Sequence, residues 1–366
     1  MSSPLDEAQR TGKCVLDLDV PAVDQIMLEL GIVALWRLRR VNREAKRRVE
    51  QELLSLPKAV LRVGGWVDSK VESFESSQTV VIDSNGVHVF SFATMFWEAR
   101  RELSERAVHH TVCDTSDGRV VVCGGPGPRN AQQLLCGAPS WSYLPDIRAM
   151  CKGASSVELS DKRIMVAGGT GGRRVSRGSS YGLADKKVFI LKADQSEWEQ
   201  AEPMNTARIS PAIAALADGR VLVAGGRRNM TTTVGVSLSS FDTAEIWDPA
   251  TGCWTTVESM TVRRANPAAC MLSDGRVMVM GGSRESPHCE IFDPATNLWQ
   301  MGAPLPAKSD GIYKDIYEKG HTVFKHTSIR AVAVRGGVLA ADSSRDPFLY
   351  DETLGKWIRI PTSGGL

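Results

Sequence analysis

The stretch Asp218-Gly219-Arg220-Val221, closed four residues later by Gly225-Gly226, decides the fold because the chain contains it four times. The other copies run from Asp117 to Gly125, from Asp161 to Gly169 and from Asp274 to Gly282. In the copy at Asp161, lysine replaces the glycine of the first pair. A repeat of roughly fifty residues indicates stacked copies of one supersecondary unit.

One repeat, residues 214–254, predicts four antiparallel strands. Asp218-Gly219 is a two-residue hairpin signal between two apolar runs, and the second run, residues 221–224, suits a strand buried on both faces. Gly225-Gly226 ends that strand, because glycine permits positive φ and close backbone approach. A variable polar segment follows. Residues 245–254 then predict a third strand, a turn beginning at Asp248-Pro249 and a fourth strand that opens on Trp254.

A four-stranded sheet cannot bury both of its faces alone, so we expect copies arranged around an axis, each blade covering the next. Glycine pairs begin at residues 64, 124, 168, 225 and 281, and a degenerate unit spans residues 329–341. The Gly-Gly pair, the spaced aromatic and the tryptophan resemble the repeats of kelch β-propellers over residues 57–366. This resemblance implies a mainly β fold: a six-bladed kelch-type propeller of four-stranded antiparallel blades, whose first blade lacks an evident first strand.

Composition excludes some partners and compartments. A formal net charge of +2 predicts no general attraction to nucleic acid or to an anionic membrane. No apolar run approaches the ~20 residues of a membrane span, and the first residues lack the apolar centre of a secretory signal. The eight cysteines include no Cys-x-x-Cys pair. We therefore expect reduced thiols and a cytoplasmic and/or nuclear protein.

After a tail at residues 1–19, residues 20–56 predict short amphipathic helices. Val20-Pro21 and the run Leu35-x-x-Leu38-x-x-Val41-Asn42-Arg43 resemble an F-box, with Asn42 where that family has cysteine. The resemblance implies docking on a Skp-type adaptor of a cullin ubiquitin ligase, with contributions from Pro21, Ile26, Leu30, Leu35, Leu38 and Val41. Two other interpretations remain: a helical cap on the propeller, or a basic patch for nuclear import or an acidic surface.

Arginines gather in the segments that we expect on one face of the propeller, in long loops between second and third strands and in the blade-to-blade connections. Long loops on a rigid scaffold commonly carry binding. A guanidinium suits carboxylate and phosphate, so these arginines predict a face for an acidic or phosphorylated peptide. The alternative is a solvated rim in which the arginines pair with distant acids. The predicted residues are Arg129, Arg173, Arg174, Arg177, Arg208, Arg227, Arg228, Arg263, Arg264 and Arg284.

Catalysis is not expected, and we assign no catalytic, cofactor or metal residue. Kelch propellers include galactose-oxidase-like copper enzymes, which need tyrosine, histidine and cysteine-derived ligands that converge on the disc centre. His109 and His110 are adjacent, so on a strand they would point to opposite faces. The kelch and F-box resemblances together imply a substrate receptor of a cullin-type ubiquitin ligase, with the propeller binding the substrate. A non-enzymatic scaffold and a galactose-oxidase-like enzyme are the alternatives.

Overall fold

The computed structural model describes part of the chain. The described residues are 59–63, 87–91, 96–100 and 110–359, except for the gaps in that last range: 118, 125–130, 136–137, 139, 148–151, 177–178, 233–234, 284–285, 307–328, 335 and 342–346.

The described residues form sheets of antiparallel strands. The three-stranded sheet is β1 (Ala59–Val63), β2 (Val87–Ser91) and β3 (Phe96–Arg100). Five sheets have four strands each. They are β4 (Thr111–Asp114), β5 (Val120–Cys123), β6 (Ala131–Leu134) and β7 (Ser142–Tyr143); β8 (Ser155–Glu158), β9 (Ile164–Ala167), β12 (Val188–Leu191) and β13 (Trp198–Ala201); β14 (Ala212–Ala215), β15 (Val221–Ala224), β18 (Ala244–Trp247) and β19 (Trp254–Val257); β20 (Ala268–Met271), β21 (Val277–Met280), β22 (His288–Asp293) and β23 (Leu298–Pro304); and β24 (Arg330–Val334), β25 (Gly337–Ala341), β26 (Pro347–Asp351) and β27 (Lys356–Arg359).

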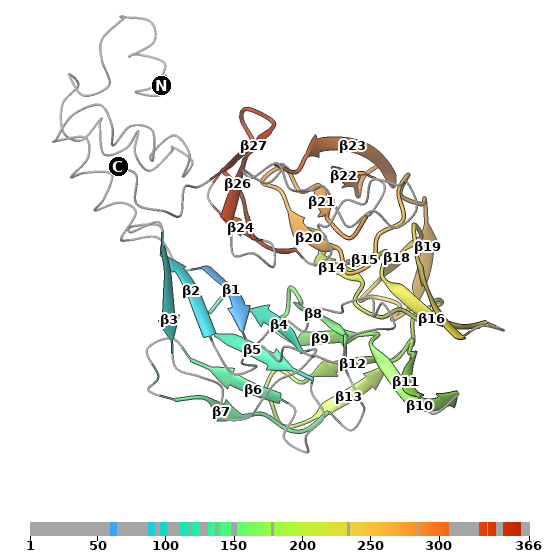
Figure 1. Cartoon of the computed structure of the whole chain (residues 1–366). Helices are drawn as coiled ribbons and strands as arrows, with labels where there is room; N and C mark the ends of the chain where they lie inside the picture. The colour runs from blue at the N-terminus through green and yellow to red at the C-terminus, as the bar shows by residue number, and fades with distance from the viewer. Residues whose placement is uncertain are drawn as a thin grey trace, which may run out of the picture.

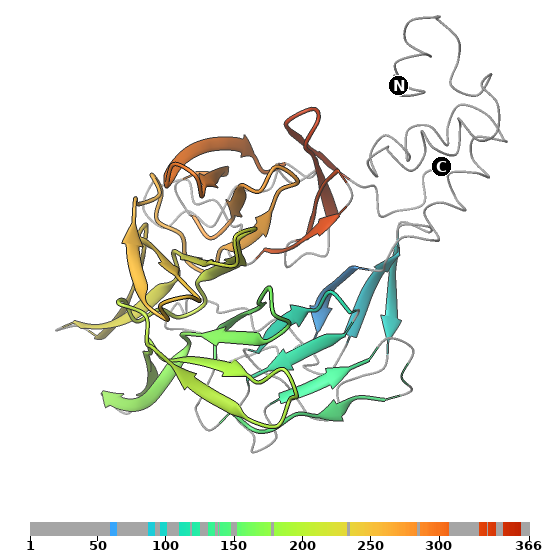
Figure 2. The same cartoon turned by 180° about the vertical axis from the view of Figure 1, so that it is seen from behind.

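The first strands of the sheets contact one another in a closed circle. β1 contacts β4, and the contacts continue through β8, β14, β20 and β24 back to β1 (Figures 1 and 2). We call these six the inner strands. The predicted propeller is confirmed, and the chain closes the ring by bringing its first sheet against its last.

The described residues show five four-stranded blades where the sequence predicts six. The sixth sheet of the ring, β1-β2-β3, has three strands among the described residues. The sequence of this sheet departs from that of the other blades. In the regular blades the glycine pair follows the second strand, which comes after the first hairpin, whereas Gly64-Gly65 directly follows β1.

The core lies in the seams between neighbouring blades, as the double-sided burial of the second strands predicts. In β15, Val221 and Val223 pack toward the preceding blade, whereas Leu222 and Ala224 pack toward the following one. All four side chains are buried. Alternate residues of a strand point to opposite faces, so one short apolar run contributes to two seams.

The Asp-x-Arg motif fastens the first turn of each regular blade. In all four copies the arginine Nε donates to the aspartate two residues earlier, over 2.7–2.8 Å. The carboxylate also accepts the arginine's backbone N–H. The arginine is thus part of the hairpin and not only a residue that follows it.

The close approach of neighbouring backbone explains why glycine pairs follow the second strands. Gly168 and Gly282 have φ values of +73° and +71°. A Cβ on Gly168 would lie 2.5 Å from the carbonyl oxygen of Arg208, and one on Gly282 would lie 2.4 Å from that of Ala265. Both contacted residues belong to connections between blades, so the glycines let these connections lie directly on the sheet.

Candidate partner-binding face

Two of the expected long loops are β-hairpins. β10 (Thr170–Ser176) pairs with β11 (Ser179–Ala184), and β16 (Arg227–Thr232) pairs with β17 (Gly235–Ser240). Each hairpin leaves its blade between the second and third strands. β11 contacts β16, and both hairpins project from the same side of the disc (Figures 1 and 2). The sequence predicts loops in these two segments, and the structure shows paired strands instead.

Arg228 and Arg263 lie near the base of the second hairpin, and both are exposed. The guanidinium carbon of Arg228 is 5.6 Å from the centroid of the Phe241 ring. Arg263 forms a 3.5 Å ion pair from its Nε to Asp242. The exposed arginines described on the predicted face are therefore one on an aromatic ring and one paired with an acid, and Arg227, the first residue of β16, is partly buried beside them.

Arg208 and Arg264 are internal and do not belong to this face. Each side chain has 0% exposure. Arg208 donates to Glu245 over 2.9 Å and to the carbonyl oxygens of Gly225 and Thr243. Arg264 donates to Glu290 over 3.0 Å. A guanidinium enclosed in this way cannot reach a partner, so burial corrects the prediction for these two residues.

Glu245 and Glu290 fasten one blade to the next. Glu245 lies on β18 and accepts the backbone N–H groups of Asn205 and Thr206, at 2.7 and 3.0 Å, in the connection that leads into its blade. Glu290 on β22 accepts those of Thr261 and Val262 in the equivalent place. The Arg–Glu pairs are repeated structural links.

The sequence contains a signal for these links. Glu245-Ile246-Trp247 and Glu290-Ile291-Phe292 place an acid directly before two apolar residues of a third strand. A buried carboxylate needs a cation and hydrogen-bond donors. The matching arginines stand at the same distance, 17 residues, before Gly225 and Gly281.

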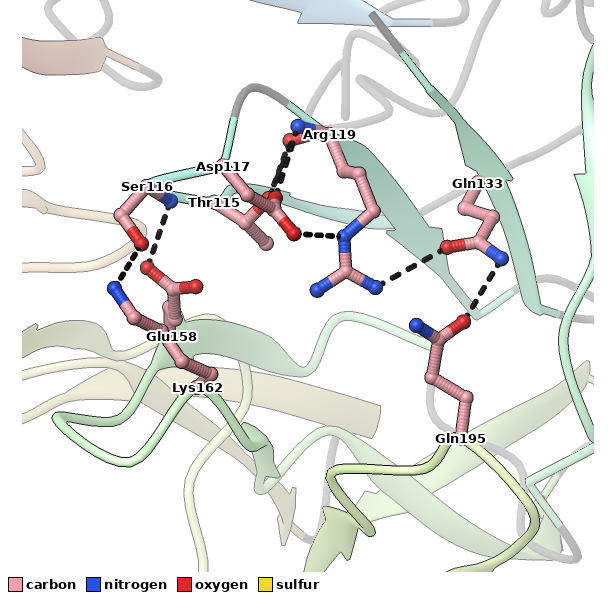
Figure 3. A network of polar contacts seen from close by, with 8 residues as sticks. All are labelled: Thr115, Ser116, Asp117, Arg119, Gln133, Glu158, Lys162 and Gln195. Atoms are coloured by element: carbon pink, nitrogen blue, oxygen red, sulfur yellow. Dashed lines mark hydrogen bonds and ion pairs between the residues drawn. The ribbon is translucent and has the colours of Figure 1, made fainter.

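A different polar network connects two blades on the side of the Asp-x-Arg turns (Figure 3). The backbone nitrogen of Ser116 donates to Glu158 over 2.8 Å, and Lys162 donates to the hydroxyl of Ser116. Gln133 donates to Gln195 of the neighbouring blade over 2.9 Å. These hydrogen bonds join polar groups of two neighbouring blades to each other.

The described residues offer little for metal or thiol chemistry. Among them, no three His, Cys, Asp or Glu side chains gather as metal ligands would. Burial raises the pKa of the Cys270 and Cys289 thiols to about 12, so these sulfurs are protonated at neutral pH. None of the described residues forms a helix long and apolar enough to cross a membrane.

The remaining predicted residues have either a described backbone position only or no described structure. The backbone of β10 places Arg173 and Arg174 on the first hairpin. Arg129, Arg177 and Arg284 fall in the gaps. Outside the described residues also lie Pro21, Ile26, Leu30, Leu35, Leu38 and Val41.

Comparisons with known proteins agree with the kelch architecture. Residues 214–261 match the Kelch motif. An F-box/kelch-repeat protein of Arabidopsis thaliana is 32% identical over 116 residues, which are 31% of this chain and 27% of that protein. Kelch-like protein 26 of Danio rerio is 25% identical over 206 residues, 54% of this chain and 31% of that protein. A second F-box/kelch-repeat protein of Arabidopsis thaliana is 28% identical over 166 residues, 44% of this chain and 40% of that protein.

The chain therefore has kelch-repeat relatives and spans less than half the length of each one described. Among solved structures, it is similar to a fungal alcohol oxidase of the AA5 family in complex with copper. That likeness has 16% identity and a TM-score of 0.45, and it covers 71% of this chain and 64% of the oxidase. A similarity this low supports no statement about activity.

Proposed function

We propose that this chain is a non-catalytic protein-recognition module that serves as the substrate receptor of a cullin-type ubiquitin ligase in the cytoplasm or nucleus. The observation that carries the proposal is the similarity to kelch-repeat proteins, two of which have F-box/kelch names. In this proposal the propeller holds the substrate, and the F-box-like segment at residues 20–56 binds a Skp-type adaptor.

The form of the propeller supports the recognition part of the proposal. Closed ring contacts and buried Arg–Glu links make a rigid support, from which two hairpins project on one side. Connections carried by such a support are where propellers and other rigid folds commonly place binding. The proposed partner surface comprises Arg129, Arg173, Arg174, Arg177, Arg227, Arg228, Arg263 and Arg284.

The adaptor part is tested by affinity capture of the tagged full-length chain, followed by identification of Skp-type adaptor and cullin. We expect both proteins with the full-length chain and neither with a chain that lacks residues 1–56. A paired substitution, Leu35→Asp with Leu38→Asp, should also abolish capture. The control Lys46→Gln with Arg47→Gln removes two charges from the same segment and should retain it.

Absence of the adaptor from the full-length capture would contradict the ligase role. It would favour the alternative, a non-enzymatic scaffold that uses the propeller for protein–protein contact. Equal thermal melting of all four proteins would show that the losses arise from binding and not from unfolding.

A further inference from the structure

Arg227 lies at the inner end of the second hairpin, where its backbone is fixed. It is the first residue of β16 and directly follows the pair Gly225-Gly226. Its nitrogen donates to the carbonyl oxygen of Ile209 over 2.9 Å, and its oxygen accepts from the nitrogen of Ile209 over 2.8 Å. Ile209 comes shortly before the inner strand β14. The Arg227 side chain therefore starts from a rigid position beside the ring of inner strands.

The guanidinium of Arg227 is half-buried without a partner for its Nε. That atom is buried and makes no hydrogen bond within the described structure. Burial lowers the pKa of Arg227, and no carboxylate offsets the effect. In Arg208 burial also lowers the pKa, but Glu245 opposes it. A desolvated donor without an acceptor is unfavourable, so an external acceptor would improve the surroundings of Arg227.

The next residue of β16, Arg228, adds a second positive charge, and its side chain leaves the strand on the face opposite to that of Arg227. Its guanidinium is exposed and lies over the Phe241 ring. The ring is positioned by backbone hydrogen bonds of 2.9 Å from Phe241 to Gly226 and from Arg264 to Phe241. Contact with the ring favours one placement of the Arg228 head. The nearby Asp242 is paired with Arg263 and leaves both charges without a described acid.

We propose that Arg227 forms a binding site for an anionic side chain of a partner peptide, with Arg228 as a neighbouring positive charge. The shared chemistry is a planar carboxylate or a phosphate group, each of which accepts hydrogen bonds from a guanidinium fork. Arg227 supplies a guanidinium whose Nε is desolvated, and Arg228 supplies an exposed charge that attracts the anion from solution. This site, the Arg227 site, deepens the proposed function, on which it rests.

Selection of random 12-residue peptides on the full-length chain tests the Arg227 site. We expect the selected peptides to be enriched in Asp and Glu. Arg227→Gln should weaken their binding at least tenfold and Arg228→Gln by a smaller factor, because Arg228 lies on the opposite face of the strand and adds only a nearby charge. Arg227→Lys, which keeps the charge and loses the fork, should resemble Arg227→Gln more than the wild type.

Two matched controls remove the same charge elsewhere. Arg220→Gln affects an arginine paired with Asp218, and Arg276→Gln affects one paired with Asp274, both in Asp-x-Arg turns outside the proposed partner surface. Neither should change binding more than twofold. A bound peptide resynthesised with phosphoserine or glutamine at each acidic position separates phosphate from carboxylate recognition, and the glutamine form should bind at least tenfold more weakly.

Two results would overturn the inference: no acidic enrichment with the wild-type chain, or unchanged affinity for acidic peptides in Arg227→Gln. Neither result would affect capture of the Skp-type adaptor, so the proposed function would stand or fall separately. Melting temperatures of the variants within the wild-type range would exclude unfolding as the cause of a loss.

Discussion

At the scale of single residues, charge has two different uses in this propeller. The buried pairs Arg208–Glu245 and Arg264–Glu290 hold blades together, whereas the exposed Asp-x-Arg pairs hold single turns. The burial of a pair decides how much it contributes to the free energy of unfolding. Breaking a buried pair leaves an uncompensated charge, but an exposed pair loses little because water solvates both groups.

Glu245→Gln should therefore destabilise the protein strongly. The amide leaves Arg208 without its counter-charge, and its N–H₂ group would face either the N–H of Asn205 or the donors of Thr206 and Arg208. We expect the free energy of unfolding in urea to fall by roughly 3–5 kcal/mol. The matched change Asp218→Asn in an exposed pair should cost less than about 1 kcal/mol. Equal losses in the two variants would contradict the structural role of Glu245.

Acid should weaken the Asp-x-Arg turns. Burial alone would raise the pKa of Asp117, but hydrogen bonds from Thr115 and Arg119 outweigh it and lower the pKa from 3.8 to about 2. A carboxylate with a depressed pKa in the folded state adds stability above pH 3.8, and that stability is lost as the pH falls toward 2. The group is half exposed, so its contribution should stay below about 1 kcal/mol.

Urea unfolding at several pH values between 5 and 2 measures this contribution. The wild type should lose stability across the acid part of the range, and Asp117→Asn should lose less. Parallel curves for the two proteins would show that the Asp117 pair contributes nothing.

At the scale of elements, the predictions succeeded where a pattern is local. The strands of the regular blades were predicted from three local patterns: the Asp-Gly signals, apolar runs such as Val221–Ala224 and the tryptophans that open the fourth strands. The hairpin of β16 and β17 was missed because the two residues between its strands in the sequence, Thr233-Val234, are not a glycine-containing hairpin signal. The burial of Arg208 was missed because it depends on Glu245, which is distant in sequence. No local pattern joins those two residues.

Two glycines with the same backbone conformation separate close approach from φ alone. Gly252 and Gly282 both have φ of +71°, but a Cβ on Gly252 meets nothing within 4 Å, whereas one on Gly282 meets a carbonyl oxygen at 2.4 Å. Gly252→Ala should cost about 1–2 kcal/mol for the left-handed conformation. Gly282→Ala should cost clearly more in the same urea assay. A smaller cost at Gly282 would refute the packing explanation.

At the scale of the whole molecule, circular contact makes every blade depend on two neighbours. The first sheet, β1 to β3, supplies the contacts to both β4 and β24. The order of the blades could be predicted from the repeat. The sequence also predicts a first blade without an evident first strand, but not how that blade joins the ring, because residues 57–110 depart from the repeat that identifies the other blades.

Deletion of residues 1–100 should open the ring. Inner strands β4 and β24 would lose their shared neighbour, so we expect a lower melting temperature, a broader transition and binding of a hydrophobic dye. A chain that lacks only residues 1–56 keeps β1 and should melt as a single sharp transition. Calorimetry of the two truncated chains makes the comparison, and identical profiles would argue against closure through β1.

The Arg–Glu links also determine where this protein can change its length. The connections that they fasten, residues 202–211 and 258–267, are equally long, whereas the segments between second and third strands differ widely. A residue inserted into a fastened connection would displace a carboxylate from its donors. An insertion beyond a glycine pair only lengthens a projection. New specificities can therefore evolve in the projections, while the spacing that winds the disc stays constant.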